Sequence, residues 1–439
     1  MSNQSFLKEF SIYTILSILG KISISIYVLA DTFFISRKLG TNGLAALNLA
    51  LPAFNLFIGV GLMLGVGGAT KYSIYKSRND DNRANLIFTN TFYLSVIASL
   101  VFVFIGIFFS RQLTLFLGAD QTVFDMTHTY LKTILIFSPA FIFNSVFSSF
   151  VRNDNNPSLA MIAMVISSLS NIVLDYVFMY PLKMGMFGAA FATCLSPIIS
   201  MLILLVHKNR KENKFHFLKV KLDKNTSKRT LSLGFPSLIG ELASGIVIMV
   251  FNMIILDLKG NIGIAAYGVV SNLSFIVMSI FIGLADGLQP LVSREHGKRN
   301  KKNVNRLLSY ALVSSLLLSV VIYIIIYTNA DSITLLFNSE KNMNLQAIAS
   351  QGLKAYFLAT PFLALNIVIS TFFTSTERAI PAFVISMLRG VVIILPAAFL
   401  MSNLFAMVGV WLSFPVTELI VAIIALVFYY YQKKTKGRY

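Results

Sequence analysis

Acidic side chains inside long apolar runs are the residues of this sequence whose positions most strongly suggest chemistry. Asp31 lies in SIYVLADTFFIS (25–36), and Asp175 lies in SSLSNIVLDYVFMYP (167–181). A charged residue at the centre of a membrane-spanning helix costs about 2.5–3.5 kcal/mol on insertion scales, and such residues usually face a cavity or a partner. Because the sequence carries this cost, we expect both carboxylates to mark a pathway for protons or cations.

Asn171 adds a second polar group to the position of Asp175. It precedes Asp175 by four residues, so the two side chains lie on one face of a helix. A proton requires one carboxylate, whereas Na⁺, as a hard cation, favours several oxygen ligands. The pair suits either ion, and the sequence leaves the choice between H⁺ and Na⁺ open. The alternatives are a structural hydrogen bond between helices for this pair, and solvation near the outer end of the helix for Asp31.

Three further acids fall inside apolar runs and are secondary candidates for cation coupling. Glu241 follows Pro236 by about a turn and a half of helix. Asp286, in GLADGLQP, is expected either to pair with a base or to line a cavity, and Glu418 lies in the last apolar run. The bases Lys21 and Arg389 also lie deep in such runs, so each could neutralise one of these acids.

The elements that must position these residues are membrane-spanning helices. The chain has 439 residues, of which 56% are hydrophobic and 12% charged, with a mean hydropathy of +0.75. A soluble domain averages about 25% charged residues, and a spanning helix needs about 20 mostly apolar ones. The sequence therefore predicts an all-α polytopic membrane protein with twelve spans: 10–36, 44–70, 86–109, 129–151, 158–180, 185–206, 231–256, 263–293, 307–328, 347–373, 380–401 and 405–431.

Positive charge predicts how these helices are oriented. Twelve spans place both termini on one side, and most of the 36 Lys and Arg residues fall in the segments of that side. Basic residues gather in cytoplasmic loops, so both termini are predicted to be cytoplasmic. The same distribution explains the net charge of +18 without a nucleic-acid partner. The segment HKNRKENKFHFLKVKLDKNTSKR (207–229) reads as a solvated connector whose cations can contact anionic lipid.

Two halves of the chain resemble each other. GTNGLAAL (40–47) matches GNIGIAAY (260–267), and LKTILIFSPAFIFN (131–144) matches LKAYFLATPFLALN (353–366). We therefore predict an N-lobe of six helices at 1–206, a basic cytoplasmic linker at 207–230 and a C-lobe of six helices at 231–439. Because each half has an even number of spans, the repeats share their orientation and are related by a pseudo-two-fold axis along the membrane normal. Such an arrangement is typical of transporters with a central cavity.

Several other functions lack their sequence signals. Cys194 is the single cysteine and the four His residues are scattered, which excludes disulfides and Cys- or His-based metal sites. GVGLMLGVGG (59–68) lies in a predicted membrane helix and indicates close helix packing rather than dinucleotide binding. There is no Walker A sequence, no catalytic triad and no cleavable signal peptide, so we expect no cofactor and no enzymatic activity.

Several motifs, taken in order, resemble a known transporter family. DTFFISRKLG, NIVLD, GAAFATCLS and GLADGLQP together resemble the multidrug and toxic compound extrusion (MATE) transporters, most closely the DinF-like or MepA-like bacterial branch, over nearly the whole chain. The resemblance implies a MATE/MOP-type fold of two lobes in a bacterial plasma membrane. It also implies that a coupling cation, H⁺ or Na⁺, binds at Asp31, Asn171, Asp175 and Thr193, and that Glu241 is an approximate match to a helix 7 Glu of some relatives.

The resemblance further implies a function, with one departure in sequence. We expect a monomeric secondary antiporter that exports lipophilic or cationic small molecules in exchange for H⁺ or Na⁺ by alternating access. The alternatives are a flippase for lipid-linked oligosaccharides or lipids from the same superfamily, and, more remotely, an integral membrane enzyme. Relatives commonly have a Pro early in helix 1, where this chain has Tyr13, so a bend of that helix would depend on Gly20 instead.

Overall fold

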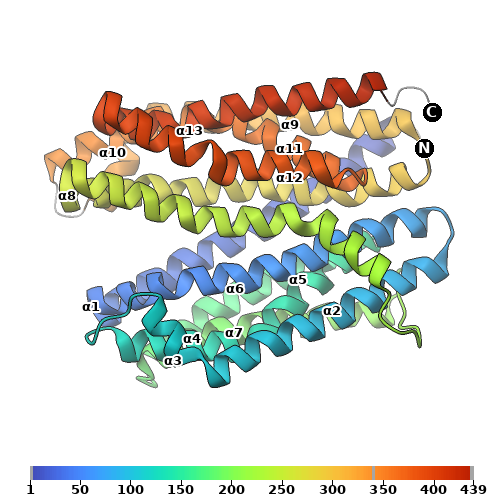
Figure 1. The fold of residues 1–439 in the computed structure, drawn as a ribbon, viewed down its shortest axis with the longest axis horizontal. Helices are drawn as coiled ribbons and strands as arrows, with labels where there is room; N and C mark the ends of the chain where they lie inside the picture. Colours follow the sequence, from blue (N-terminus) through green and yellow to red (C-terminus); the bar gives the residue numbers. More distant parts are fainter. Residues whose placement is uncertain (1–2, 339–341, 436–439) are drawn as a thin grey trace.

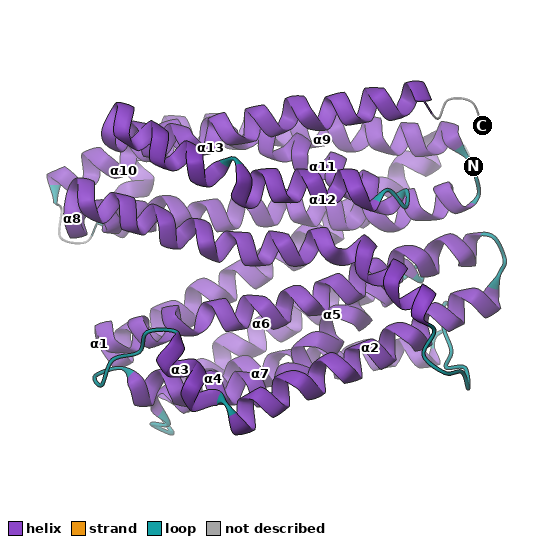
Figure 2. Ribbon diagram, in the orientation of Figure 1, coloured by secondary structure: helices purple, strands orange, loops and turns teal. Residues whose placement is uncertain are grey.

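A computed structural model describes residues 3–338 and 342–435 of the chain. Helices make up nearly all of it, and the described residues contain no strand (Figure 2). The bounds of the α-helices are α1 Asn3–Ser77, α2 Asp81–Phe108, α3 Ser110–Phe116, α4 Phe124–Ile136, α5 Ser138–Asn153, α6 Pro157–Met179, α7 Gly185–Leu205, α8 Lys224–Gly297, α9 Lys301–Phe337, α10 Met343–Tyr356, α11 Thr360–Ser375, α12 Ala379–Met387 and α13 Ile394–Thr435. Three short elements connect them: η1 Val206–Asn209, η2 Phe357–Ala359 and the π-helical η3 Leu388–Val392.

The predicted spans can be traced on these helices. Within the described residues, eight helices are long and apolar enough to cross a membrane, or nine if α4 and α5, which meet at a 48° bend, count as one. Four of them contain a residue with non-helical φ/ψ: Gly40 in α1, Gly260 in α8, Asn329 in α9 and Ala406 in α13. Asn329 lies close to the end of α9, so dividing the helices at Gly40, Gly260 and Ala406 and counting α4 with α5 as one span accounts for the twelve predicted spans.

The backbone itself repeats between the two halves. Gly40 (φ 67°, ψ −154°) and Gly260 (φ 62°, ψ −155°) adopt the same conformation, which only glycine adopts without strain. The loops that follow also match, since Asn79 and Arg299 both have positive φ. The halves recognised in the sequence are therefore structural repeats.

The helices form two bundles with both termini at the same end (Figure 1). Helices α1–α7 form most of the N-lobe, and α8–α13 form most of the C-lobe. We call the end that carries the termini and the loop 206–223 the basic end, and the other the far end. The bundles approach each other at the basic end and diverge toward the far end (Figure 1).

Each lobe receives the start of the other lobe's first helix. Phe6 and Phe10, from the beginning of α1, belong to a hydrophobic cluster whose other members include Leu284 and Leu288 of α8. Conversely, Gly234 near the beginning of α8 lies against the backbone of Met63 in α1. The lobes are thus interlocked at the basic end, although the chain order assigns these segments to opposite halves.

Close approach of α1 and α8 requires glycine. A Cβ at Gly283 would lie 2.6 Å from the Cα of Ile18, and one at Gly287 would lie 2.6 Å from the Cα of Thr14. Any larger residue at these positions would force the backbones apart. Gly20, in contrast, keeps helical φ/ψ. Within the described part of α1, the residue that interrupts the helix is Gly40, so the helix is not broken at Gly20.

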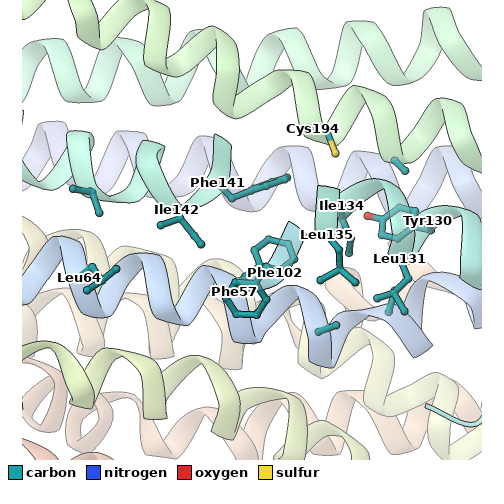
Figure 3. Close-up of a cluster of buried hydrophobic side chains, with 14 of the residues drawn as sticks. Phe57, Leu64, Phe102, Tyr130, Leu131, Ile134, Leu135, Phe141, Ile142 and Cys194 are labelled. Carbon is teal, nitrogen blue, oxygen red and sulfur yellow. The ribbon is translucent and has the colours of Figure 1, made fainter. Parts of the chain in front are cut away.

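The core of the N-lobe surrounds the region where α1, α4 and α7 meet. Its buried members include Phe57 of α1, Phe102 of α2, Tyr130 of α4 and Cys194 of α7. Figure 3 shows Tyr130 beside Leu131 in this cluster, so the core includes a phenol hydroxyl among apolar side chains.

Candidate functional site

Four predicted site residues are buried in the N-lobe. The exposed fraction is 7% for Asp31 of α1 and 3% for Thr193 of α7, while Asn171 and Asp175 of α6 are fully buried. Asp31 and Asp175 lie close enough to interact electrostatically. The structure therefore brings two carboxylates from distant parts of the sequence into one buried place.

Unpartnered oxygens distinguish this group from an ordinary polar core. Oδ1 of Asp31, both carboxylate oxygens of Asp175 and both amide atoms of Asn171 are buried without a hydrogen-bond partner among the described residues. Buried polar groups are nearly always paired, and each exception calls for an explanation such as a missing ion, water or proton. The donor set, two carboxylates and an amide oxygen, is one that a proton or a hard cation can satisfy.

Two tyrosines complete the group, and sequence reasoning did not find them. Tyr130 is buried and Tyr27 is half-buried, and both lie within electrostatic range of Asp31 and Asp175; Tyr130 is also hydrogen-bonded to Thr193. Tyr27 precedes Asp31 by four residues, so helical spacing could have identified it. Tyr130 carries no local signal, because only folding brings α4 to this place. We call these six residues the N-lobe cluster: Tyr27, Asp31, Tyr130, Asn171, Asp175 and Thr193.

The N-lobe cluster lies in the half of the molecule where the lobes diverge. Asp31 precedes the far-end break at Gly40 by nine residues, which is about 14 Å of helix. Asp175 is five residues from Tyr180, where α6 ends at the same side. The N-lobe cluster is therefore closer to the far end than to the basic end.

Asp286 has a different environment, between the lobes. Its Oδ2 lies 3.4 Å from Nζ of Lys21 and 3.1 Å from Nη1 of Arg152. Both cations belong to the N-lobe bundle, whereas Asp286 belongs to α8. Of the two possibilities for Asp286, pairing with a base is confirmed, and the pair joins the lobes.

Glu241 lies near the same contact rather than in the N-lobe cluster. It is half-buried within electrostatic range of Lys21, and a Cβ at Gly59 would lie 3.2 Å from the Cβ of Glu241. The structure therefore separates Glu241 and Asp286 from Asp31 and Asp175, although all four are acids within spans.

Glu418 forms a third environment, inside the C-lobe. It is 1% exposed, and its Oε1 accepts hydrogen bonds from Nε and Nη2 of Arg389 at 3.2 and 2.9 Å. Nδ2 of Asn366 donates to its Oε2 at 2.7 Å. Arg389 lies in the π-helical stretch η3, a local widening often found where a helix must present a particular side chain. The charge of Glu418 is thus neutralised within the lobe.

Polar side chains also join the lobes nearer the basic end. Nε2 of Gln289 in α8 donates to Oγ1 of Thr70 in α1 at 2.9 Å, and Nδ2 of Asn153 in α5 donates to Oε1 of Gln289 at 2.8 Å. Lys71 and Glu377 form an ion pair across the same contact. These hydrogen bonds and ion pairs therefore close the structure at the basic end, and they would have to break for the lobes to separate there.

Comparisons with known proteins agree with this architecture. The model of the MatE family matches residues 17–177 and 236–400, one segment in each half. The multidrug export protein MepA of Staphylococcus saprophyticus subsp. saprophyticus is 24% identical over 420 residues, which cover 95% of this chain and 92% of that protein. The predicted resemblance to MATE transporters of the MepA-like branch is confirmed.

Solved structures share the whole fold. A multidrug resistance MATE family transporter of the MOP superfamily, solved in an outward-facing conformation, aligns with a TM-score of 0.90 at 21% identity, covering 96% of this chain and 94% of that one. A MOP superfamily transporter from Pyrococcus furiosus, described as having a binding pocket of reverse polarity, aligns with a TM-score of 0.91 at 21% identity. The alignment covers 98% of this chain and 97% of that one. All of these related proteins are named as transporters or export proteins and none as an enzyme, which agrees with the prediction from the sequence. The chain is a multi-pass membrane protein that belongs to the MatE family.

Proposed function

We propose that this protein is a secondary antiporter of a bacterial plasma membrane that exports lipophilic or cationic small molecules in exchange for H⁺ or Na⁺. The coupling cation binds in the N-lobe cluster, at Asp31 and Asp175 with Asn171 and Thr193. The protein acts as a monomer with both termini in the cytoplasm, and it requires neither a cofactor nor nucleic acid.

One observation supports this proposal above the others: Asp31 and Asp175 are two buried carboxylates within electrostatic range of each other, and they carry oxygens without a hydrogen-bond partner. Two such charges in a low-dielectric interior repel each other, so at least one must bind a proton or a cation to be stable there. Loss of that ion restores the repulsion between the two buried carboxylates, so the ion directly influences the conformation of the lobe.

The contacts between the lobes support alternating access. The ion pairs of Asp286 with Lys21 and Arg152 and the hydrogen bonds of Gln289 hold the basic end closed while the far end diverges. An ion that binds more tightly to this arrangement, and a substrate that binds more tightly to the arrangement open at the basic end, would shift the protein between the two conformations. The export of several drugs is taken from the name of the related MepA proteins, at 24–25% identity.

The experiment is efflux of a fluorescent organic cation from proteoliposomes under an imposed H⁺ or Na⁺ gradient. The wild-type protein is expected to respond to one of the two gradients. Asp31→Asn and Asp175→Asn remove the charge but keep the shape, so each is expected to abolish the response.

A matched control uses the same substitution at an exposed carboxylate. Asp257→Asn changes an exposed residue of α8 three positions before Gly260, and transport by this variant is expected to equal that of the wild type. Undiminished gradient-driven efflux in both Asp31→Asn and Asp175→Asn would overturn the proposal, as would wild-type efflux that ignores both gradients.

A further inference from the structure

The linker between the lobes is held along α2 by hydrogen bonds to its backbone. The amide of His216 donates to Oδ1 of Asn85 at 2.9 Å, and that of Leu218 donates to Oγ1 of Thr89 at 3.0 Å. The amide of Asp223 donates to Oδ1 of Asn90 at 2.8 Å. The connecting segment is therefore an extended strip fixed to the N-lobe, with most of its side chains exposed.

The depth of this strip follows from the sequence of α2. The helix begins at Asp81, and its apolar run begins near Leu86. Asn90, the last of the three side chains that bind the linker, is nine residues or about 14 Å from the start of α2. The strip therefore runs beside the first turns of a helix that is long and apolar enough to span a membrane, and we expect it to lie at the level of the lipid headgroups.

Aromatic side chains fix one side of the strip to the helix. The ring centroid of Phe215 lies 4.6 Å from that of Phe88, and the centroid of Phe217 lies 4.9 Å from those of Phe88 and Phe92. The cations of the strip remain exposed: Lys208, Arg210, Lys211, Lys214, Lys219 and Lys221. Phe217 is itself 58% exposed, so the surface combines positive charge with an apolar edge.

A cavity lies where the end of the strip meets the start of α8. Its volume is about 280 Å³, and its lining includes Tyr75, Arg83, Leu86, Ile87, Asp223 and Arg229. The guanidinium of Arg83 lies 5.7 Å from the ring centroid of Tyr75. Two arginines over an apolar floor suit a ligand that has an anionic head and an apolar body.

The acids near this cavity are already engaged. Asp223 caps α8 by accepting from the amide of Thr226 at 2.7 Å, and hydrogen bonds from Thr226 hold its pKa below the usual range. Asp80 caps α2 by accepting from the amide of Arg83, whose Nε lies 3.3 Å from Oδ2 of Asp80. With the linker cations included, positive charge exceeds negative charge around the opening.

We propose that the cavity and the adjoining linker form a binding site for an anionic phospholipid, whose headgroup lies between Arg83 and Arg229 and whose first acyl carbons contact Leu86 and Ile87. The headgroup depth of the strip and its charge argue for a lipid of the surrounding bilayer rather than a soluble anion. Because the linker leads from α7 to α8, a lipid held there contacts the connection between the two lobes.

The test is native mass spectrometry of the purified full-length protein in detergent with phosphatidylglycerol or phosphatidylcholine of identical acyl chains. The wild-type protein is expected to bind phosphatidylglycerol more tightly by at least tenfold. Each cation near an anionic surface contributes about 1 kcal/mol, so the double variant Arg83→Gln/Arg229→Gln is expected to lose about thirtyfold in affinity for phosphatidylglycerol. Its affinity for phosphatidylcholine is expected to be unchanged.

Matched variants keep the test decisive. Lys302→Gln/Arg306→Gln removes the same charge from the start of α9 at the same end of the molecule, and is expected to keep wild-type selectivity. If Arg83→Gln/Arg229→Gln fails to fold, as judged by thermal unfolding in detergent, Lys219→Gln/Lys221→Gln tests the exposed strip and is expected to weaken phosphatidylglycerol binding severalfold. Equal losses in the α9 variant, no loss in the cavity and strip variants, or displacement of the lipid by equimolar inorganic phosphate would each overturn the proposal.

Discussion

The two lobes treat a buried carboxylate in opposite ways. In the C-lobe, Glu418 receives three hydrogen bonds from the side chains of Arg389 and Asn366, so its charge is neutralised within the fold. In the N-lobe, Asp31 and Asp175 lie together with unpartnered oxygens. An acid paired in this way has no need of an external ion, whereas an unpaired acid does. Two lobes with a common architecture can therefore differ in whether they respond to a cation.

The same difference is visible where neighbouring helices meet. In the N-lobe, α6 and α7 are joined by the hydroxyls of Ser167 and Ser196, 2.7 Å apart. In the C-lobe, the corresponding helices are joined by Arg389 and Glu418. The C-lobe thus uses its buried charge for a helix contact that the N-lobe makes with neutral groups.

The largest expected effect concerns the stability of the C-lobe. Glu418→Gln leaves the half-buried Arg389 without a counter-charge, and breaking such a pair costs about 3 kcal/mol in the free energy of unfolding. Asp175→Asn is expected to cost nothing or to stabilise, since it removes a charge that has no partner. Thermal unfolding in detergent measures both. The double variant Arg389→Met/Glu418→Leu is expected to regain most of the loss, and equal destabilisation by Glu418→Gln and Asp175→Asn would contradict the comparison.

A second effect concerns how Asp31 and Asp175 work together. If both belong to one cation site, each single Asn variant reduces gradient-driven efflux on the order of 100-fold, and the double variant loses no more, because residues that act as a unit are not additive. Initial rates in proteoliposomes measure this. Single losses that multiply in the double variant would show that the two acids act independently.

The contact between the lobes should respond to a smaller change. Asp286→Asn leaves Lys21 and Arg152 without their shared partner, so the closed basic end is expected to lose at least about tenfold in relative population, ~1.4 kcal/mol. Spin labels at Leu182→Cys and Leu336→Cys, both exposed at the far end, report the distance between the lobes. An unchanged distance distribution would mean that Asp286 does not hold the lobes together.

The smallest expected effect belongs to Tyr130. Tyr130→Phe removes the hydrogen bond to Thr193, which is worth about 1 kcal/mol, so the cation concentration for half-maximal efflux is expected to rise about fivefold. The maximal rate should change little. Tyr323→Phe, at a half-buried C-lobe tyrosine far from the N-lobe cluster, provides the control and is expected to leave this concentration unchanged.

Much of the fold could be predicted because the membrane limits the possibilities. Each span must be an apolar helix of nearly fixed length, so hydropathy locates the helices, and the repeated Gly40 and Gly260 locate matching breaks. Interlocking of the lobes could not be predicted, because the start of α1 is as apolar as the helices it might contact in either lobe. The hydrogen bonds that fix the linker also join residues distant in sequence, and no local pattern announces them.

The sequence by itself determined which residues carry charge into the membrane, because each such residue stands out against an apolar run whatever it contacts. Only the tertiary structure decided what each charge does. Asp31, Asp175, Asp286 and Glu418 are all acids in spans, yet their neighbours differ. Asp31 and Asp175 lie within electrostatic range of each other, Asp286 pairs with Lys21 and Arg152, and Glu418 pairs with the half-buried Arg389. The physical reason is that the electrostatic state of a buried acid depends on the nearest charges in space, and helices far apart in the chain supply them.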